Sequence, residues 1–350
     1  MRRLSSAPSM AMVLLLVATG CGAPGAPNLA GDGVAVSPVW PPAPAQSRIR
    51  FERSISGPGD LGIARPLFRR MIDAFVGRGD ERFVRPTGVA ELDGVLYVAD
   101  PGTPALWILD SSHNRYARID EAGGTRLVSP VAVALRPDGA VFVADSVLKK
   151  VLLLDRDGKL IRVAAEQDLE RPAALAFDAA GERLYVADSA RQRIAVYAAD
   201  GTLNGAWGRA GALDGEFNFP THLALDRTGT LLATDALNFR IQAFDRNGRF
   251  LWKFGRHGDG SGDLAAPKGL AADSAGHVYV ADALFDGVQV FERDGAFLLA
   301  FGDRGTQPGQ FWLPGGLFIN AQDRIFVADG YNRRIQVFAV VAGAGPEPDQ

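Results

Sequence analysis

Short apolar runs that end in Asp recur at nearly constant intervals along most of this chain. A typical run reads LYVAD or VFVAD. The six runs end at Asp100, Asp145, Asp188, Asp235, Asp282 and Asp329, with spacings of 45, 43, 47, 47 and 47 residues. Self-similarity at a fixed period of this length predicts that one supersecondary unit is repeated six times.

Each unit predicts four short strands, which we letter a to d in chain order. Strand a follows a Pro, strand b ends in the repeated Asp, and strands c and d resemble RIQAF and FLWKF. The opening prolines are Pro86, Pro130, Pro172, Pro220, Pro267 and Pro314. Units of four strands separated by Gly, Asp and Asn turns are typical of propellers. The sequence therefore predicts an all-β, six-bladed β-propeller with four antiparallel strands per blade.

The last unit lacks strand d, because the sequence after Phe338 continues as AVVAGAGPEPDQ. Residues 48–55, RIRFERSI, place Ile49, Phe51 and Ile55 on one face of a strand. We expect this strand to complete the sixth blade beside residues 334–338, since closure removes an open sheet edge. The propeller then spans residues 47–340, and residues 341–350 are predicted to be a disordered tail.

Residues 66–76 carry apolar side chains at helical spacing, and Gly77 follows them. This pattern predicts one short amphipathic helix. The helix either caps one end of the propeller or faces a membrane or a partner.

The first twenty residues have the form of a secretory signal peptide. Arg2 and Arg3 precede a short apolar run, and small residues stand directly before Cys21. The pattern resembles the lipobox of bacterial lipoproteins, although Ala18 stands where Leu is usual. The resemblance implies cleavage before Cys21 and acylation of that residue, and plain secretion with a free thiol is the alternative. Gly22 follows where an inner-membrane retention Asp would stand, which favours the outer membrane.

Residues 21–46 are rich in Gly, Ala and Pro, which predicts a tether between the lipid and the propeller. The chain contains no run of 18 or more apolar residues, so no membrane-spanning helix is predicted. A formal net charge of −3 argues against a nucleic-acid partner. Cys21 is the single cysteine, so the mature domain has no disulfide, Cys-zinc site or catalytic thiol.

The tandem pattern over about residues 83–338 resembles the NHL repeat family. Its parts are a Pro-x-Gly-type start, VAD, RIQVF and GxFLxxFG. The resemblance implies a six-bladed propeller, and propellers of this family bind proteins or RNA in other settings. The export signal and the acidity make RNA a poor choice here.

The repeated Asp residues are interpreted as structural, because six equivalent acids cannot serve one catalytic centre. Each carboxylate can accept backbone N–H bonds in the turn between strands b and c. Bases stand five residues later in four units, at Lys150, Arg193, Arg240 and Arg334. We expect partly exposed ion pairs there, contributing ~0–1 kcal/mol each.

His222 is the one candidate catalytic residue. Six-bladed propellers include metal-dependent lyases and lactonases, and His222 stands at the start of an inner strand. The equivalent positions are Gly88, Ala132, Ala174, Gly269 and Gly316, so a three-His zinc site is not expected. No cofactor is predicted; calcium or zinc belongs only to the enzyme alternative.

One further polar position recurs at the end of strand a. It is occupied by Asp178, Asp226, Asp273 and Asn320. We interpret these residues as stabilising the turns between strands a and b, rather than as ligands of a metal or substrate.

The turns between strands b and c and the loops that lead into strand a share one surface, which we name the loop face. Blades four to six place large apolar residues there: Leu237, Phe239, Leu284, Phe285 and Tyr331. An exposed apolar sector marks a partner site. The alternative is that neighbouring loops, with Phe217, Trp312 and Leu313, cover it.

Two hypotheses follow. The first is a monomeric, lipid-anchored propeller of the cell envelope, exposed to the periplasm or beyond, that binds a protein or glycan partner as a scaffold. The second is a hydrolase or lyase with a metal site on the axis, in which His222 takes part. The sequence favours the first, because no complete catalytic set can be assembled around His222.

Overall fold

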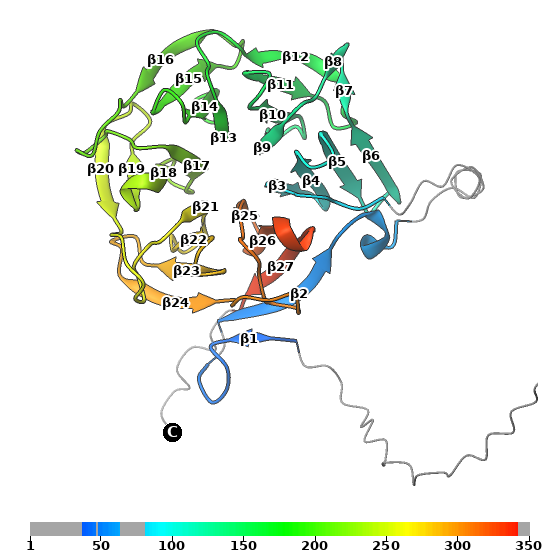
Figure 1. Cartoon of the computed structure of the whole chain (residues 1–350). Coiled ribbons are helices and arrows are strands. Elements are labelled where there is room, and N and C mark those ends of the chain that lie inside the picture. The colour runs from blue at the N-terminus through cyan, green and yellow to red at the C-terminus, as the bar shows by residue number, and fades with distance from the viewer. Residues whose placement is uncertain (1–36, 47, 64–80, 342–350) are drawn as a thin grey trace, which may run out of the picture. The chain divides into compact units, whose positions relative to one another are not determined.

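The computed structural model describes residues 37–46, 48–63 and 81–341. Most of their strands form six sheets that radiate around a central axis (Figure 1). Residues 1–20, Cys21 and the expected helix at 66–76 lie outside the described residues. The prediction of an all-β, six-bladed propeller with four antiparallel strands per blade is confirmed.

The blades follow the chain in order. Blade 1 contains β3 (Gly88–Leu92), β4 (Val95–Asp100), β5 (Ala105–Asp110) and β6 (Arg115–Ile119). Blade 2 contains β9 (Pro130–Leu135), β10 (Val141–Asp145), β11 (Lys150–Leu154) and β12 (Leu160–Ala165). Blade 3 contains β13 (Pro172–Asp178), β14 (Arg183–Asp188), β15 (Arg193–Ala198) and β16 (Leu203–Trp207).

Blade 4 contains β17 (Pro220–Leu225), β18 (Leu231–Asp235), β19 (Arg240–Phe244) and β20 (Phe250–Phe254). Blade 5 contains β21 (Pro267–Ala272), β22 (Val278–Asp282), β23 (Gly287–Phe291) and β24 (Phe297–Phe301). Blade 6 contains β25 (Leu317–Ile319), β26 (Arg324–Asp329), β27 (Arg334–Val340), β2 (Ile49–Ile55) and β1 (Val39–Trp40). A small ribbon, β7 (Glu121–Ala122) with β8 (Thr125–Arg126), joins blades 1 and 2, and short 3-10 turns occur at Pro58–Leu61, Ala236–Asn238 and Gly330–Asn332.

The N-terminal strand closes the ring as predicted. In Figure 1, β2 (blue) lies beside β27 (red), and the two strands pair antiparallel with Phe51 opposite Phe338 and Ile55 opposite Ile335. Their apolar side chains face the core, since Ile49 and Ile55 are almost fully buried. The two ends of the propeller are therefore joined by one continuous sheet, which leaves blade 6 no unpaired edge at β27.

The predicted tether, residues 21–46, is too long at its C-terminal end. Val39 and Trp40 pair with β2 as a fifth strand of blade 6. The Trp40 ring packs 5.8 Å from the Phe338 ring and 5.9 Å from the Phe301 ring. One large aromatic side chain thus attaches a Pro-rich segment that has no periodic apolar pattern.

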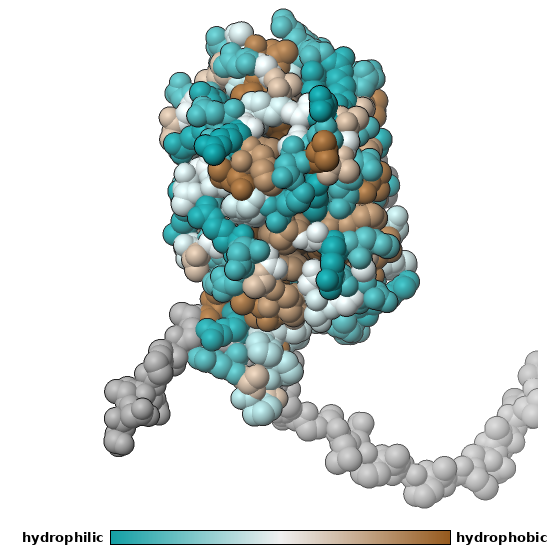
Figure 2. All heavy atoms as spheres, turned by 90° about the vertical axis from the view of Figure 1, so that its left-hand side faces the viewer, coloured by the Kyte–Doolittle hydropathy of each residue, from teal (hydrophilic) through white to brown (hydrophobic). Residues whose placement is uncertain are grey.

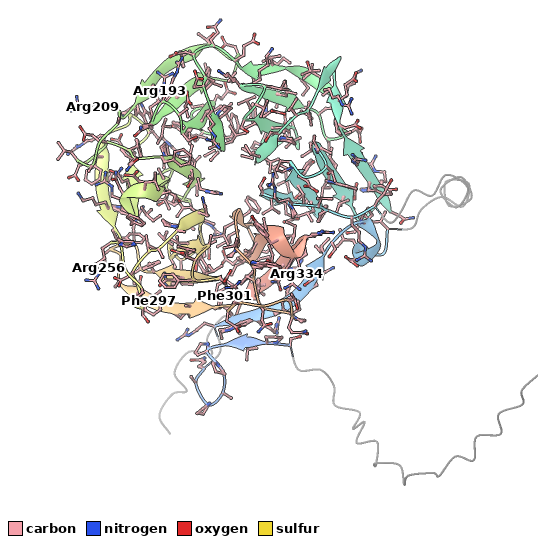
Figure 3. All side chains as sticks on the ribbon, in the orientation of Figure 1. Arg193, Arg209, Arg256, Phe297, Phe301 and Arg334 are labelled. Carbon is pink, nitrogen blue, oxygen red and sulfur yellow. The ribbon has the colours of Figure 1, made fainter. Side chains whose placement is uncertain are left out.

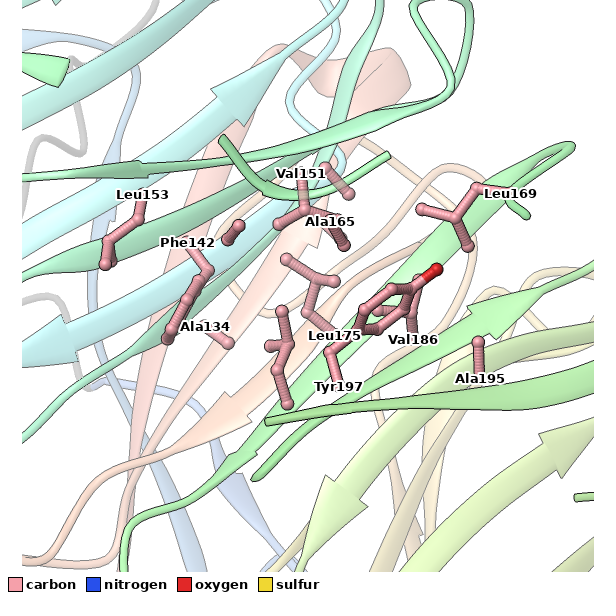
Figure 4. Packing of buried hydrophobic residues seen from close by; sticks show 14 of the residues in the cluster. Ala134, Phe142, Val151, Leu153, Ala165, Leu169, Leu175, Val186, Ala195 and Tyr197 are labelled. Atoms are coloured by element: carbon pink, nitrogen blue, oxygen red, sulfur yellow. The ribbon is translucent and has the colours of Figure 1, made fainter. Parts of the chain in front are cut away.

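The core lies between neighbouring blades. Figure 4 shows one such layer, where Phe142 and Leu153 of blade 2 meet Leu175, Val186 and Tyr197 of blade 3. The outer wall is more mixed: Figure 2 shows separate hydrophobic patches within a largely hydrophilic surface. Burial of these inter-blade layers is the main source of stability, because each sheet has two apolar faces.

Backbones approach closely around the axis, where the six inner strands meet. A Cβ atom added to Gly316 of blade 6 would lie 2.1 Å from the carbonyl oxygen of Thr87, beside blade 1. A Cβ atom added to Gly88 would lie 2.8 Å from the carbonyl oxygen of Val131 in blade 2. These positions are equivalent to His222 in the repeat. The space between neighbouring inner strands is too narrow there for a side chain, which explains the glycines.

Candidate functional site

The six repeated Asp side chains are fully buried and fasten the loop that leads into their own blade. Asp100, for example, accepts hydrogen bonds from the backbone N–H groups of Val84 (2.7 Å) and Arg85 (2.9 Å). The corresponding acceptors are Asp145, Asp188, Asp235, Asp282 and Asp329. The b-to-c turn supplies further N–H donors in some blades, such as Gly102 to Asp100. Through these hydrogen bonds the carboxylates hold the loops and turns of the loop face in place.

In blades 4 and 6 the Asp also bonds a buried Arg directly opposite it in the sheet. The distance between Arg240 Nε and Asp235 Oδ2 is 2.8 Å, as is that between Arg334 Nε and Asp329 Oδ2. The expectation of partly exposed pairs is wrong for these two, because only 8% and 10% of the arginine side chains is exposed. In Figure 3, Arg334 lies within blade 6, whereas Arg256 points outward from the ring.

The other two bases bind elsewhere. The nearest nitrogen of Arg193 lies 4.0 Å from Asp188, and it donates instead to Asp168 at 2.6 Å. Lys150 pairs with Glu166 at 2.8 Å. These contacts are on the surface, so the shared sequence position does not give a shared interaction.

Sequence reasoning missed the amide side chains that complete the buried network. Asn332 and Gln336 both donate to Asp329, and Asn238 and Gln242 donate to Asp235. Burial raises the pKa of Asp235 and Asp329, and hydrogen bonds from Asn238 and Arg240 and from Asn332 and Arg334 oppose that shift. The signal was present as D-x-x-N-x-R-I-Q, which occurs in units four and six.

The recurrent position at the end of strand a is part of the a-to-b turns. Asp178, Asp226, Asp273 and Asn320 each accept a backbone N–H from that turn. Asp226 also bonds Arg293 of the next blade at 2.5 Å, and Asp273 bonds the Tyr279 hydroxyl at 3.0 Å. Their oxygens are occupied within the turns and between blades.

The apolar sector of the loop face is largely open. Leu237, Leu284 and Tyr331 are 54%, 66% and 54% exposed. Phe239 and Phe285 are half-buried, and the Phe239 ring lies 4.3 Å from that of His257.

The loops that could have covered this sector do not bury it. Phe217 is fully buried in the core between blades 3 and 4. Trp312 is itself exposed, and its ring lies 5.6 Å from that of Tyr331. Leu313 is half-buried and turns toward the axis, where it lines a pocket.

This axial pocket opens on the loop face and has a volume of about 380 Å³. Strand a of blade 4 contributes Thr221 and His222, while Arg171 comes from blade 3 and Lys268 from blade 5. Tyr331 forms part of the rim. The pocket thus brings together the candidate His222 and one member of the apolar sector.

His222 is held as a neutral imidazole. Its Nδ1 atom is buried and has no hydrogen-bond partner among the described residues. Burial, and then the charge of Lys268, lowers the pKa of His222 to about 3. A neutral imidazole can donate or accept a hydrogen bond at physiological pH, but it carries no charge there.

The donor set around His222 does not fit a divalent metal. The pocket is lined by two cations and by no Asp or Glu side chain. Within the described ranges, no group of three or more His, Cys, Asp or Glu side chains is arranged to hold a metal ion. Ca²⁺ needs several converging oxygens, and zinc needs neutral or anionic ligands, so Arg171 and Lys268 oppose both. A second axial cavity of about 450 Å³ lies among the inner strands and is lined mostly by apolar side chains such as Leu175, Leu225 and Phe318.

No family model and no curated protein matches the chain. Solved structures do resemble it. A streptogramin B lyase matches with a TM-score of 0.56 at 13% identity, over 74% of this chain and 94% of that one. A chain of a nidogen/laminin complex matches with a TM-score of 0.54 at 19% identity, over 70% and 86%. An auxiliary nutrient binding protein from Bacteroides thetaiotaomicron matches with a TM-score of 0.57 at 12% identity, over 73% and 69%.

At these identities the likeness establishes the propeller fold alone, because one fold serves unrelated functions. Among the described residues there is no helix of the length and apolarity needed to cross a membrane.

Proposed function

We propose that this protein is a binding or scaffold propeller of the NHL type, anchored to the outer membrane through lipidated Cys21. Its loop face binds a protein or glycan partner in the cell envelope. The observation that carries the proposal is the exposure of Leu237, Leu284 and Tyr331 on adjacent blades.

The position two residues after the repeated Asp supports this interpretation. Val147, Leu237, Leu284 and Tyr331 occupy it and are each more than half exposed. A tight turn needs no large apolar residue there. Covering such exposed apolar side chains with a partner lowers the free energy of the complex. Aromatic side chains such as Tyr331 and Trp312 are frequent anchors of interfaces.

The structural neighbours include proteins that are named for binding or that belong to a complex. One is a nutrient binding protein and another is part of a nidogen/laminin complex. They support a binding role by analogy of fold, and they leave the partner of this chain open to experiment.

The partner surface is tested with Leu284→Asp/Tyr331→Asp in the full-length protein. The matched control is Leu251→Asp/Leu298→Asp, since these leucines are also exposed, at 43% and 42%, but lie on the outer strands β20 and β24. Crosslinking in the native envelope, followed by mass spectrometry, should recover a partner with wild type and control but not with the loop-face variant. Equal recovery with both variants contradicts the proposal.

Anchoring is tested separately with Cys21→Ser. Several acyl chains, at about 0.8 kcal/mol per buried CH₂, hold a protein durably on a membrane. The wild type should therefore sediment with membranes and take up labelled palmitate, and the variant should do neither. Palmitate uptake by the variant contradicts lipidation at Cys21.

The alternative is a hydrolase or lyase with an axial site. It is favoured by the position of His222 in the pocket and by the likeness to a streptogramin B lyase. Metal analysis of the purified domain tests it, with His222→Ala as the control. Stoichiometric Ca²⁺ or Zn²⁺ that is lost in the variant supports the alternative, and metal that is retained or absent in both contradicts a role for His222 as a ligand.

A further inference from the structure

The charged ends of Arg171 and Lys268 have no hydrogen-bond or ion-pair partner within the described part of the chain. Neither side chain makes a hydrogen bond or ion pair, although most other cations around the loop-face rim do. Arg171 lies over the Phe219 ring at 5.5 Å from its centroid, a contact that leaves the guanidinium charged. Arg171 is exposed and Lys268 is half-buried, so two like charges repel each other at one small pocket and only Lys268 loses part of its solvation.

Lys268 and Arg171 both line the axial pocket. Burial lowers the pKa of Lys268, and the charge of Arg171 lowers it further. The carboxylate that partly offsets this is Asp282, which is fully buried and already accepts backbone N–H groups, including those of Ala265 and Ala266. Asp282 does not line the pocket, and neither does any other Asp or Glu side chain.

Two further polar atoms of the pocket wall lack partners. Thr221 is only 7% exposed, and its hydroxyl has no hydrogen-bond partner among the described residues. The Nδ1 atom of His222, on the same strand, is also unpaired. Buried polar atoms are normally paired, so unpaired ones that line a pocket point to a bound ligand.

We propose that the axial pocket binds a small organic anion, with its carboxylate or phosphoryl group between Arg171 and Lys268 and polar contacts to Thr221 and His222. Both cations bind oxyanions well, and Arg can do so with two parallel hydrogen bonds. The half-buried Leu313 and the buried Pro314 provide an apolar wall for the rest of the molecule. The volume, about 380 Å³, is within the range of small-molecule sites.

This site goes beyond the proposed partner surface, because it depends on charge at the axis rather than on exposed apolar side chains. Calorimetric titration of the purified full chain tests it with galacturonate and galactose, which share a ring and differ in the carboxylate. Inorganic phosphate is the third probe and distinguishes a phosphoryl from a carboxylate preference. Binding of galacturonate or phosphate, but not of galactose, is the expected result.

Arg171→Gln/Lys268→Gln should weaken that binding at least tenfold, since charge-assisted hydrogen bonds are lost. The matched control is Arg126→Gln/Lys159→Gln, which removes the same charge from exposed side chains away from the pocket. Thermal unfolding of both variants without ligand verifies that they fold. Binding that survives in the pocket variant, equal binding of galactose, or no binding of either anion overturns the proposal.

Discussion

Arg334 donates through Nε to Asp329 Oδ2 at 2.8 Å, and its two other nitrogens bond three carbonyl oxygens of the preceding loop, those of Thr306, Gln307 and Gln310. An acid and a base at this spacing suggest catalysis, but four of the five N–H groups of this guanidinium donate hydrogen bonds inside the protein. The pair therefore defines the shape of the loop face: the carboxylate fixes the loop where it enters the blade, and the arginine fixes its middle.

We expect Arg334→Met to lower the free energy of unfolding by about 3–5 kcal/mol, because the buried Asp329 carboxylate loses its counter-charge and three carbonyl groups lose a donor. Lys150→Met is the matched control at the equivalent repeat position. Lys150 makes only a surface pair with Glu166, so its loss should cost no more than about 1 kcal/mol. Denaturant unfolding measures the free energy of unfolding of both variants. Equal decreases would show that the buried pair stabilises the protein no more than the surface pair does.

Gly316→Ala should be strongly destabilising, whereas Gly315→Ala should be nearly neutral. The added Cβ atom at Gly316 would lie 2.1 Å from the Thr87 carbonyl oxygen, where blade 6 meets blade 1. At Gly315 the same atom would meet only the Ala328 carbonyl oxygen, at 3.8 Å. A backbone shift at the junction should cost about 1–3 kcal/mol, as overpacking does. A melting temperature of Gly316→Ala at or above that of Gly315→Ala would contradict this close approach.

Most of the fold could be predicted from the sequence, because the repeat determines the order of the strands. The alternation of apolar and polar residues identifies the closing strand. Ile49, Phe51 and Ile55 alternate with polar residues and so mark a buried face. Trp40 gives no such signal, since two residues between prolines carry no period, and its strand was assigned to the tether. The donors to the repeated Asp were also missed in part, because they lie 15 to 18 residues earlier in the chain.

The axial pocket could not be predicted by comparing equivalent repeat positions. Arg171 precedes the Pro of its unit, Lys268 follows its Pro, and His222 stands two residues after its Pro. Only the radial arrangement of three blades brings these different positions to one space. The exposed sector was easier to identify, since Leu237, Leu284 and Tyr331 occupy one repeat position.

Ring closure depends on aromatic packing in blade 6, and Phe51→Ala should weaken it. The Phe51 ring contacts that of Phe338 edge-on at 5.6 Å and is 8% exposed. Truncation of a buried Phe costs about 3–5 kcal/mol. Arg50→Ala on the same strand is the control, because Arg50 is exposed and should change stability by less than about 0.5 kcal/mol. If limited proteolysis and unfolding curves of the two variants coincide, β2 does not hold the ring closed.

The pH dependence of stability should contain a contribution from His222. Its pKa is about 3 in the folded protein, because of burial and then Lys268, and about 6.5 in an unfolded chain. Between these values the unfolded state binds more protons, so the contribution is complete above about pH 6.5 and is lost as pH falls toward 3. We expect the free energy of unfolding of wild type, minus that of His222→Gln, to be constant above neutrality and to decrease between about pH 6.5 and 4. The subtraction cancels the groups that both proteins share. A difference that does not change with pH would show that His222 is protonated in the folded pocket as readily as in the unfolded chain.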